Sequence, residues 1–308
     1  MSRRPPRNMA ASVKQRLLNL ADERGEDFNF LLVRYAAERL LYRLSQSEYS
    51  GDFVLKGAML FHLGPNQSRY RPTRDIDLLG KGSPDLERLE GIFRKLCEIQ
   101  VPDDGLVLLP KSVKARRIQE EAEYKGIRVN LETRMGSARI AVQIDVGFGD
   151  ALERPLKRES LATLLDFPPP HLPVYPWEGV IAEKFQALVE RGMGNSRMKD
   201  YFDLRHLAGT LNFDGAKLAR AIEATFERRR MELPKGIPIG LSEAFAQDSA
   251  KQAQWRAFLR RLRVDAENDP LEGVVERVRA FLMPPVEAVA SGKPFKMKWP
   301  ASGPWCSP

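Results

Sequence analysis

Cysteine and histidine are scarce in this sequence. Only 2 cysteines and 3 histidines occur among its 308 residues. Cys97 and Cys306 lie far apart, and neither has a further Cys or His at the spacing of metal ligands, so the sequence indicates neither a disulfide framework nor a zinc site. The histidines show no spacing typical of a catalytic triad. We therefore expect a protein of the reducing cytoplasm.

Long apolar runs are also missing. No stretch approaches the roughly 20 apolar residues that a membrane-spanning helix needs. The basic segment at residues 1–12 is followed by charged residues, where a signal peptide requires a continuous apolar core. The sequence thus predicts no association with a membrane.

The composition supplies a large core and an excess of positive charge. Hydrophobic residues make up 43% of the chain and charged residues 29%, which excludes a disordered or fibrous protein. At roughly 100 to 200 residues per domain, the length allows two domains. There are 49 Lys and Arg against 41 Asp and Glu, and the resulting net charge of +8 favours a polyanionic partner such as a nucleotide or nucleic acid.

The spacing of apolar residues predicts a mixed α/β region in the first half of the chain. Residues 1–50 contain two stretches with helical spacing. Residues 51–166 contain short apolar runs typical of strands, with one helical stretch at 84–100. A hairpin turn is predicted near Met135 and Gly136.

A proline-rich segment separates this region from a helical one. Five prolines between Pro168 and Pro176 exclude a helix there and favour an extended connector, residues 167–176. Residues 177–285 show helical patterns without a convincing strand, and residues 286–308 show no periodicity. We therefore predict an α+β fold, in which a mixed sheet with helices is followed by a C-terminal helical domain and a tail.

The strongest chemical signal is the segment Thr73-Arg74-Asp75-Ile76-Asp77. On a strand, successive side chains alternate between faces, so both aspartates point the same way while Ile76 faces the core. Two acids at this distance favour a hard cation such as Mg²⁺, which takes few carboxylates and completes its shell with substrate phosphates. Two solvated acids at a strand edge would give the same pattern.

Two further features add to this pair. Gly57 follows a short apolar run, where a glycine lets backbone N–H groups approach a triphosphate, and a helix beginning at Ala58 would favour the anion. Most such glycines only form a turn. Strict alternation places Asp145 on the polar face of another strand, where it can join Asp75 and Asp77. Three converging carboxylates would repel unless metal ions compensate them, although Asp145 on a merely wet face is the alternative.

In the helical half, two cations and two acids occur at helical spacing. Lys184 lies inside an apolar stripe, and Arg191, seven residues later, shares its face, so both could bind phosphates. Asp200 and Asp203 lie on one face of the next helix and could hold these cations or serve the chemistry. A lysine at the stripe edge and ordinary ion pairs are the alternatives. We expect Lys184 to reach the cleft of Asp75, because a buried lysine needs an anionic partner.

Two basic runs also occur in this half of the chain. Such runs are usually solvated helix faces, and the alternative is that they contact RNA phosphates without reading sequence. The runs are Arg228-Arg229-Arg230 and the set Arg256, Arg260, Arg261 and Arg263.

The motifs, taken in order over about residues 50 to 210, resemble the AbiEii/MenT nucleotidyltransferase toxins. They read G-A-x-L, R-P-T-R-D-I-D-L, Q-I-D-V-G-F-G-D, I-A-E-K-F-x-A-L-x-x-R and R-x-K-D-Y-F-D-L. The resemblance implies the fold of the DNA polymerase β-like nucleotidyltransferases and the toxin role of a type IV toxin–antitoxin system, with a cognate antitoxin as partner. Some members transfer nucleotides to the 3′ end of tRNA.

The resemblance also implies roles for single residues. Asp75 and Asp77 match the metal-binding pair, and Asp145 looks like a third sheet carboxylate. Lys184 matches the essential lysine. The acid of the R-x-K-D motif matches Asp200, with Asp203 as a neighbouring candidate. Nucleotide contacts are implied for Thr73, Arg74, Arg191 and the pair Gly57 and Ala58. The family usually has Gly-Gly or Gly-Ser at that pair, so Ala58 removes a side-chain contact to phosphate but leaves the backbone cradle.

Three functions follow as hypotheses. The first is an enzyme that binds an NTP with Mg²⁺ and transfers NMP to an RNA hydroxyl, with a tRNA 3′ end as the expected acceptor. Asp145 would then help to deprotonate the attacking hydroxyl, and Lys184 would neutralise the triphosphate. The second is a protein that sequesters a nucleotide or RNA without transfer. The third is a nucleotidyltransferase that modifies a protein or a small molecule.

Overall fold

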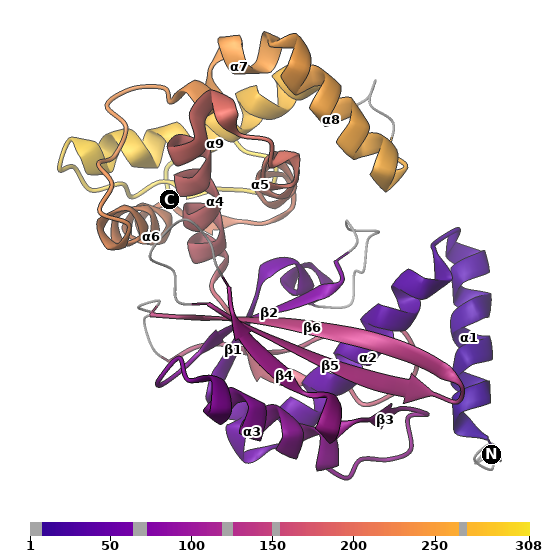
Figure 1. Ribbon diagram of the computed structural model, residues 1–308. Coiled ribbons are helices and arrows are strands. Elements are labelled where there is room, and N and C mark those ends of the chain that lie inside the picture. Colours follow the sequence, from indigo (N-terminus) through magenta and orange to yellow (C-terminus); the bar gives the residue numbers. More distant parts are fainter. Residues whose placement is uncertain (1–7, 64–72, 119–125, 150–154, 265–269) are drawn as a thin grey trace. The chain divides into compact units, whose positions relative to one another are not determined.

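The computed structural model describes residues 8–63, 73–118, 126–149, 155–264 and 270–308 (Figure 1). The chain divides into two compact units, Met1–Tyr175 and Pro176–Pro308. The first contains a mixed sheet with helices and the second is mainly helical, which confirms the predicted fold class. None of the described helices is both long and apolar enough to span a membrane.

The first unit is built on a six-stranded sheet. Its strands run in the order β1 (Phe53–Lys56), β2 (Asp75–Gly80), β6 (Ala138–Phe148), β5 (Ile127–Met135) and β3 (Val107–Leu108), and β4 (Lys114–Arg117) also pairs with β5. The central pair, β2 and β6, is parallel, and the other pairs are antiparallel. The predicted hairpin turn joins β5 to β6, where Gly136 has a φ of +57° that favours glycine.

The two faces of the sheet differ in polarity. Every second residue of β5 from Ile127 to Met135 is buried, and the residues between them are polar and at least partly exposed. Helices α2 (Phe28–Ser45) and α3 (Leu86–Glu98) pack against the apolar face, and α1 (Met9–Arg24) packs on α2 (Figure 1). The opposite face of β2, β6 and β5 therefore presents polar side chains.

A buried cluster of charges ties α2 to the loops beside it. Arg39 and Arg43 donate to the carboxylate of Asp104, at 3.1 and 2.7 Å, and all three side chains are buried. Glu38, also fully buried, accepts from Arg34 at 3.0 Å and from the backbone N–H of Leu164 at 2.9 Å. Because a buried charge is costly without a partner, these contacts fix the loops to the helix.

The proline-rich segment is extended, and it is attached to the sheet. Its short strand β8 (His171–Pro173) pairs with β7 (Arg158–Ser160). The N–H of Tyr175 then donates to the carbonyl oxygen of Leu55 in β1 at 2.9 Å. The segment that leaves the first unit is therefore held beside β1.

The second unit contains six α-helices among its described residues. These are α4 (Trp177–Arg191), α5 (Met198–Thr210), α6 (Gly215–Arg228), α7 (Glu243–Gln247), α8 (Ser249–Leu262) and α9 (Leu271–Ala290). Helix α9 continues through Pro284 and Pro285 into the predicted tail. The rest of the tail is packed, because β10 (Lys298–Trp299) pairs with β9 (Phe213–Asp214) and the buried Trp299 ring lies 4.9 Å from that of Phe281.

Glu38 makes the stability of the first unit depend on pH. Burial raises the pKa of Glu38 to about 6 from 4.5, although the Arg34 charge opposes the rise. Its contribution to stability is therefore present below about pH 4.5 and is lost as the pH rises through about 6. We expect the difference in unfolding free energy between the wild type and Glu38→Gln to change by about 2 kcal/mol over this range. Urea unfolding at several pH values measures it, and a difference independent of pH would contradict the expectation.

Candidate active site

The predicted aspartate pair lies on the polar face of the sheet. Asp75 is exposed and Asp77 is half-buried, while Ile76 between them is fully buried. The two carboxylates therefore share one face of β2, as the alternation predicts. Thr73 and Arg74 precede the pair on the described part of the chain, and Arg74 is exposed. Arg71 and Pro72 of the motif lie outside the described residues.

Strand pairing sets a row of four charges across this face. Asp77 lies opposite Asp145 on the parallel strand β6. Lys56 of β1 lies opposite Asp77 on its other side, and Arg128 of β5 lies opposite Asp145. Neighbouring strands are about 4.8 Å apart, so the two carboxylates stand side by side between two cations.

Arg128 binds both oxygens of Asp145. Its Nε and Nη2 donate to the two carboxylate oxygens, each at 2.7 Å, in a planar two-point contact. The Asp145 hydrogen bond raises the pKa of Arg128, and the negative charges of Asp145, Asp75 and Asp77 add to the rise against partial burial. Arg128 was not among the predicted site residues, and metal ions were expected to compensate Asp145 instead. The signal was present, because alternation puts Arg128 on the polar face of its strand.

Gly57 lies directly against Asp77. Its φ of +69° is one that residues with a side chain rarely adopt, and a Cβ built on it would lie 1.9 Å from Oδ2 of Asp77. Glycine is therefore required here for two reasons. The predicted helix after it is a 3₁₀-helix of six residues, Gly57–His62, in which Ala58 is buried. The expected α-helical N-terminus for an anion is thus absent from this described segment.

The carboxylates of Asp75 and Asp77 are the candidate ligands for a hard cation among the described residues of this face. Among the described residues, no group of three or more His, Cys, Asp or Glu side chains is arranged to hold a metal ion. Both oxygens of Asp145 are taken by Arg128, which leaves Asp75 and Asp77. Mg²⁺ commonly binds one or two carboxylates and completes its shell with water and phosphate, so this donor set fits it.

The second unit contains a buried cluster around Lys184. Its ammonium group lies 2.9 Å from Oδ1 of Asp200 and 2.7 Å from Oδ2 of Asp203, both of which are fully buried. Arg197 donates to the other oxygen of Asp200 at 2.5 Å. Burial alone would raise the pKa of Asp200, but Lys184 and Arg197 outweigh it and hold this pKa well below its usual value. Stability from Asp200 is thus present above about pH 4 and lost in stronger acid.

Arg191 does not join this cluster. It is the last residue of α4, is exposed, and makes no ion pair within the described part of the chain. Arg197, the residue just before α5, lies beside Asp200, where the spacing had predicted Arg191. The binding of nucleotide by Lys184, Arg191 and Asp203 stays a prediction, and so does a catalytic role of Lys184 and Asp200.

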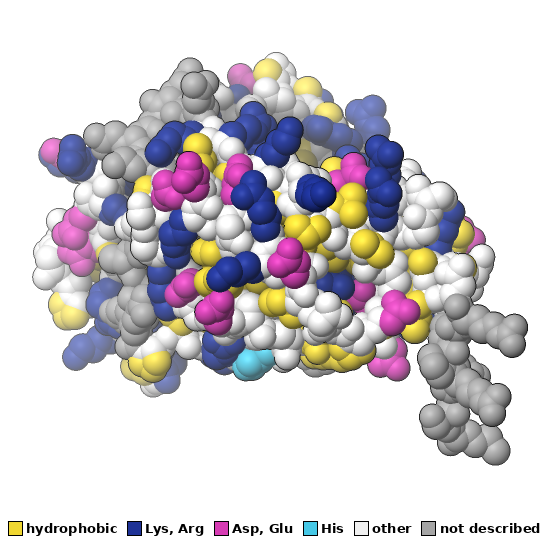
Figure 2. Space-filling view, turned by 60° about the horizontal axis from the view of Figure 1, so that its bottom comes forward, with side chains coloured by type: hydrophobic (Ala, Val, Ile, Leu, Met, Phe, Trp, Pro, Cys, Tyr) yellow, Lys and Arg dark blue, Asp and Glu magenta, His cyan; other side chains and the backbone are white. Residues whose placement is uncertain are grey.

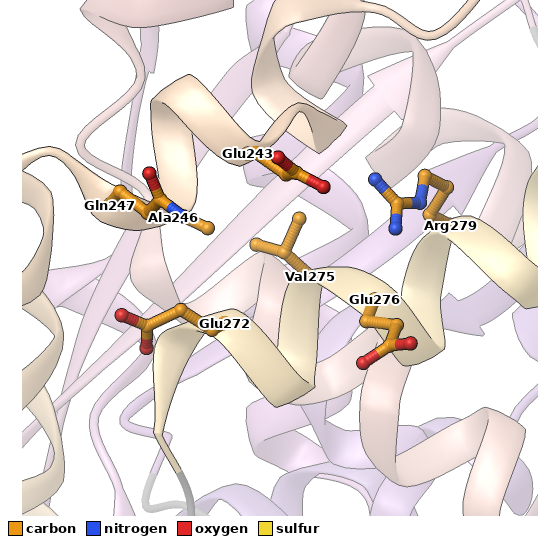
Figure 3. Close-up of a pocket in the computed structure, with 7 residues that line it drawn as sticks. All are labelled: Glu243, Ala246, Gln247, Glu272, Val275, Glu276 and Arg279. Carbon is orange, nitrogen blue, oxygen red and sulfur yellow. The ribbon is translucent and has the colours of Figure 1, made fainter.

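A pocket elsewhere in the second unit has the wrong charge for a nucleotide. It has a volume of about 220 Å³ and lies between α7 and α9 (Figure 3). Its charged lining consists of Glu243, Glu272, Glu276 and Arg279, so it would repel phosphate. It includes none of the predicted site residues.

The two basic runs differ in exposure. Arg228 is half-buried and lies 3.5 Å from Glu183 of α4. The arginines of and just after α8 are all exposed; they are Arg256, Arg260, Arg261 and Arg263. Figure 2 shows a face on which Lys and Arg side chains lie scattered among Asp and Glu, without forming one continuous basic surface.

Comparisons with known proteins give a family for this chain. Residues 39–284 match a family described as "Nucleotidyl transferase AbiEii toxin, Type IV TA system". No curated protein matches the sequence. Among solved structures, the chain is similar to JHP933 from Helicobacter pylori at 13% identity and a TM-score of 0.46, covering 82% of this chain and 90% of that one. It is similar to a candidate nucleotidyltransferase from H. pylori at 13% identity and a TM-score of 0.44, covering 82% and 92%.

Gly57→Ala tests the contact between Gly57 and Asp77. The matched control is Gly136→Ala, because Gly136 also has a positive φ but has open space where a Cβ would lie. Both variants strain the backbone by about 1 kcal/mol, and Gly57→Ala must also displace Asp77. We expect Gly57→Ala to lower the free energy of unfolding by at least about 2 kcal/mol more than the control in urea denaturation. Equal losses would show that no close contact exists.

Lys184→Met tests the buried cluster of the second unit. Removing the ammonium group leaves Asp200 and Asp203 without their shared cation, so we expect a loss of about 3 to 5 kcal/mol in unfolding free energy. Lys217→Met, at an exposed lysine of α6, is the control and should change little. Adding Asp203→Asn to Lys184→Met should restore part of the loss. A cost below about 1 kcal/mol would mean that the cluster is not a unit of stability.

Proposed function

Because the chain belongs to the AbiEii family of nucleotidyltransferase toxins of type IV toxin–antitoxin systems, we propose that it transfers NMP from an NTP to an RNA hydroxyl with Mg²⁺. Membership makes it a nucleotidyltransferase and implies an NTP substrate and an antitoxin partner. The proposed acceptor is the 3′ end of a tRNA. The observation that carries the proposal is the placement of Asp75 and Asp77 on one face, with Gly57 against Asp77.

In this proposal the aspartate pair holds the metal. The two carboxylates offer oxygen ligands on an accessible face, and the half-buried Asp77 is fixed between Gly57 and Asp145. A divalent cation bound there would neutralise the triphosphate and polarise the α-phosphate. The backbone at Gly57, which no side chain covers, lies on the side where a triphosphate would approach Asp77.

The reaction exchanges one phosphorus–oxygen bond for another. The acceptor hydroxyl oxygen bonds to the α-phosphorus, the bond to the pyrophosphate oxygen breaks, and pyrophosphate leaves with that electron pair. Asp145 is proposed to accept the hydroxyl proton, since it neighbours Asp77. One of its oxygens would have to leave Arg128 to do so, which makes Arg128 a positioning residue for that base.

Positive charge supports RNA as the acceptor. The chain has a formal net charge of +8, and the arginines of α8 are exposed. Phosphate contacts by such residues give affinity without fixing a base. The same charge would suit a protein that sequesters RNA, so transfer itself has to be measured.

Substitution of the aspartate pair tests the proposal. Purified protein would be incubated with Mg²⁺, each labelled NTP in turn, and RNA, protein or small-molecule acceptors. We expect label in RNA, and we expect Asp75→Asn and Asp77→Asn each to reduce transfer by more than about 1000-fold without loss of fold. Asp22→Asn, at an exposed acid of α1, is the control.

Three outcomes would overturn the proposal in different ways. Label in a protein or a small molecule instead of RNA would show that RNA is not the acceptor. RNA binding without label under any NTP would favour sequestration. Near-wild-type transfer by both Asn variants would remove the metal site from this pair.

A further inference from the structure

Two cations on the polar face of the sheet make no ion pair with an acid among the residues that the structure describes. Lys114 and Arg116 lie on β4, opposite Asn130 and Arg128 of β5. Residues paired in register point to the same face, so both lie on the face that carries Asp75 and Asp77. Both side chains are exposed and make no ion pair with the described residues.

Three arginines on this face lie beside acids. Arg128 is bound to Asp145, and Arg134 and Arg139 both lie within 4 Å of Glu132, at 3.7 and 3.9 Å. In contrast, Arg116 faces another arginine directly across the strand pair, an arrangement that costs energy in an antiparallel sheet. An anion bound over β4 would offset this cost.

The geometry of the proposed transfer indicates which anion would bind over β4. In-line displacement places the attacking oxygen and the leaving pyrophosphate on opposite sides of the phosphorus. Gly57 stands on the β1 side of Asp77, so a triphosphate there leaves the β6, β5 and β4 side for the acceptor. Three strand spacings separate β2 from β4, about 14 Å, which corresponds to about four nucleotides at roughly 3.4 Å each.

We propose that Lys114 and Arg116 bind backbone phosphates of the acceptor RNA a few nucleotides before its reacting 3′ end. This inference rests on the proposed function, because it takes the acceptor to be RNA. It makes the polar face of β5 and β4 the track of the acceptor strand. It also gives a role to the strand register, which places Arg116 in one row with Asp145 and Asp77.

A competing explanation is that the charges protect an edge. Because β5 is the one described strand that pairs with β4, β4 lies at an edge of the described sheet, and Lys and Arg at such an edge discourage pairing with other chains. If the charges only protect the edge, their removal should change aggregation and should leave the KM for the RNA acceptor unchanged. A comparison of a long RNA acceptor with a dinucleotide acceptor therefore distinguishes the two explanations.

The test compares Lys114→Gln/Arg116→Gln with Lys14→Gln/Arg24→Gln. The control pair removes the same charge from α1, which packs on α2. For a long RNA acceptor, we expect the first variant to raise the acceptor KM about tenfold and to leave the NTP KM unchanged. The slope of log affinity against log salt should fall in magnitude by about 1.4 for a single strand. For a dinucleotide acceptor, wild type and variant should not differ.

A second measurement uses the unmodified protein and so does not depend on how the variant folds. Bound RNA should protect Lys114 from acetylation, read by mass spectrometry, and should leave Lys95 reactive. If wild type labels RNA but the variant keeps its acceptor KM and Lys114 stays reactive, the inference is wrong and the charges protect an edge. If wild type neither binds nor labels RNA, the proposed function itself fails.

Discussion

The site depends on the parallel pairing of β2 with β6, which sets Asp77 beside Asp145. Two carboxylates on neighbouring strands repel, and the fold meets this repulsion with a cation on each side of the row. Arg128 binds Asp145 at two points, each at 2.7 Å. Gly57 then allows the chain to pass close to Asp77. The same polar face therefore carries Asp145, which Arg128 binds, and the aspartate pair for which we propose a metal.

In the second unit, neighbouring acids are also compensated by a cation, but there the two acids are buried. Asp200 and Asp203 are fully buried, and Lys184 serves both. Such a cluster is costly to break, because each buried charge would lose its partner. In the first unit, Arg39, Arg43 and Asp104 do the same for α2. Buried ion pairs thus hold elements of each unit in place, whereas Asp75, to which we assign a metal, is exposed.

Local patterns predicted the strands and the faces, and they failed where a partner comes from elsewhere in the chain. Alternation was sufficient to put Asp75, Asp77 and Asp145 on polar faces. The predicted hairpin pairs the strands of Arg128 and Asp145, but alternation assigns only a face and no register, so their contact was missed. Helical spacing gave Arg191 the face of Lys184, but α4 ends at that residue and Arg197 approaches from the next turn instead. The helix predicted after Gly57 is a short 3₁₀-helix. Residue composition does not distinguish such a helix from the first turns of an α-helix.

A crystal structure with Mn²⁺ and a non-hydrolysable NTP would test the central claim most directly. Anomalous scattering locates Mn²⁺ without assumption about its ligands. The account predicts Mn²⁺ within about 2.3 Å of carboxylate oxygens of Asp75 and Asp77, with the triphosphate beside Gly57. Metal bound away from this pair, or a triphosphate on the β5 and β4 side, would contradict it.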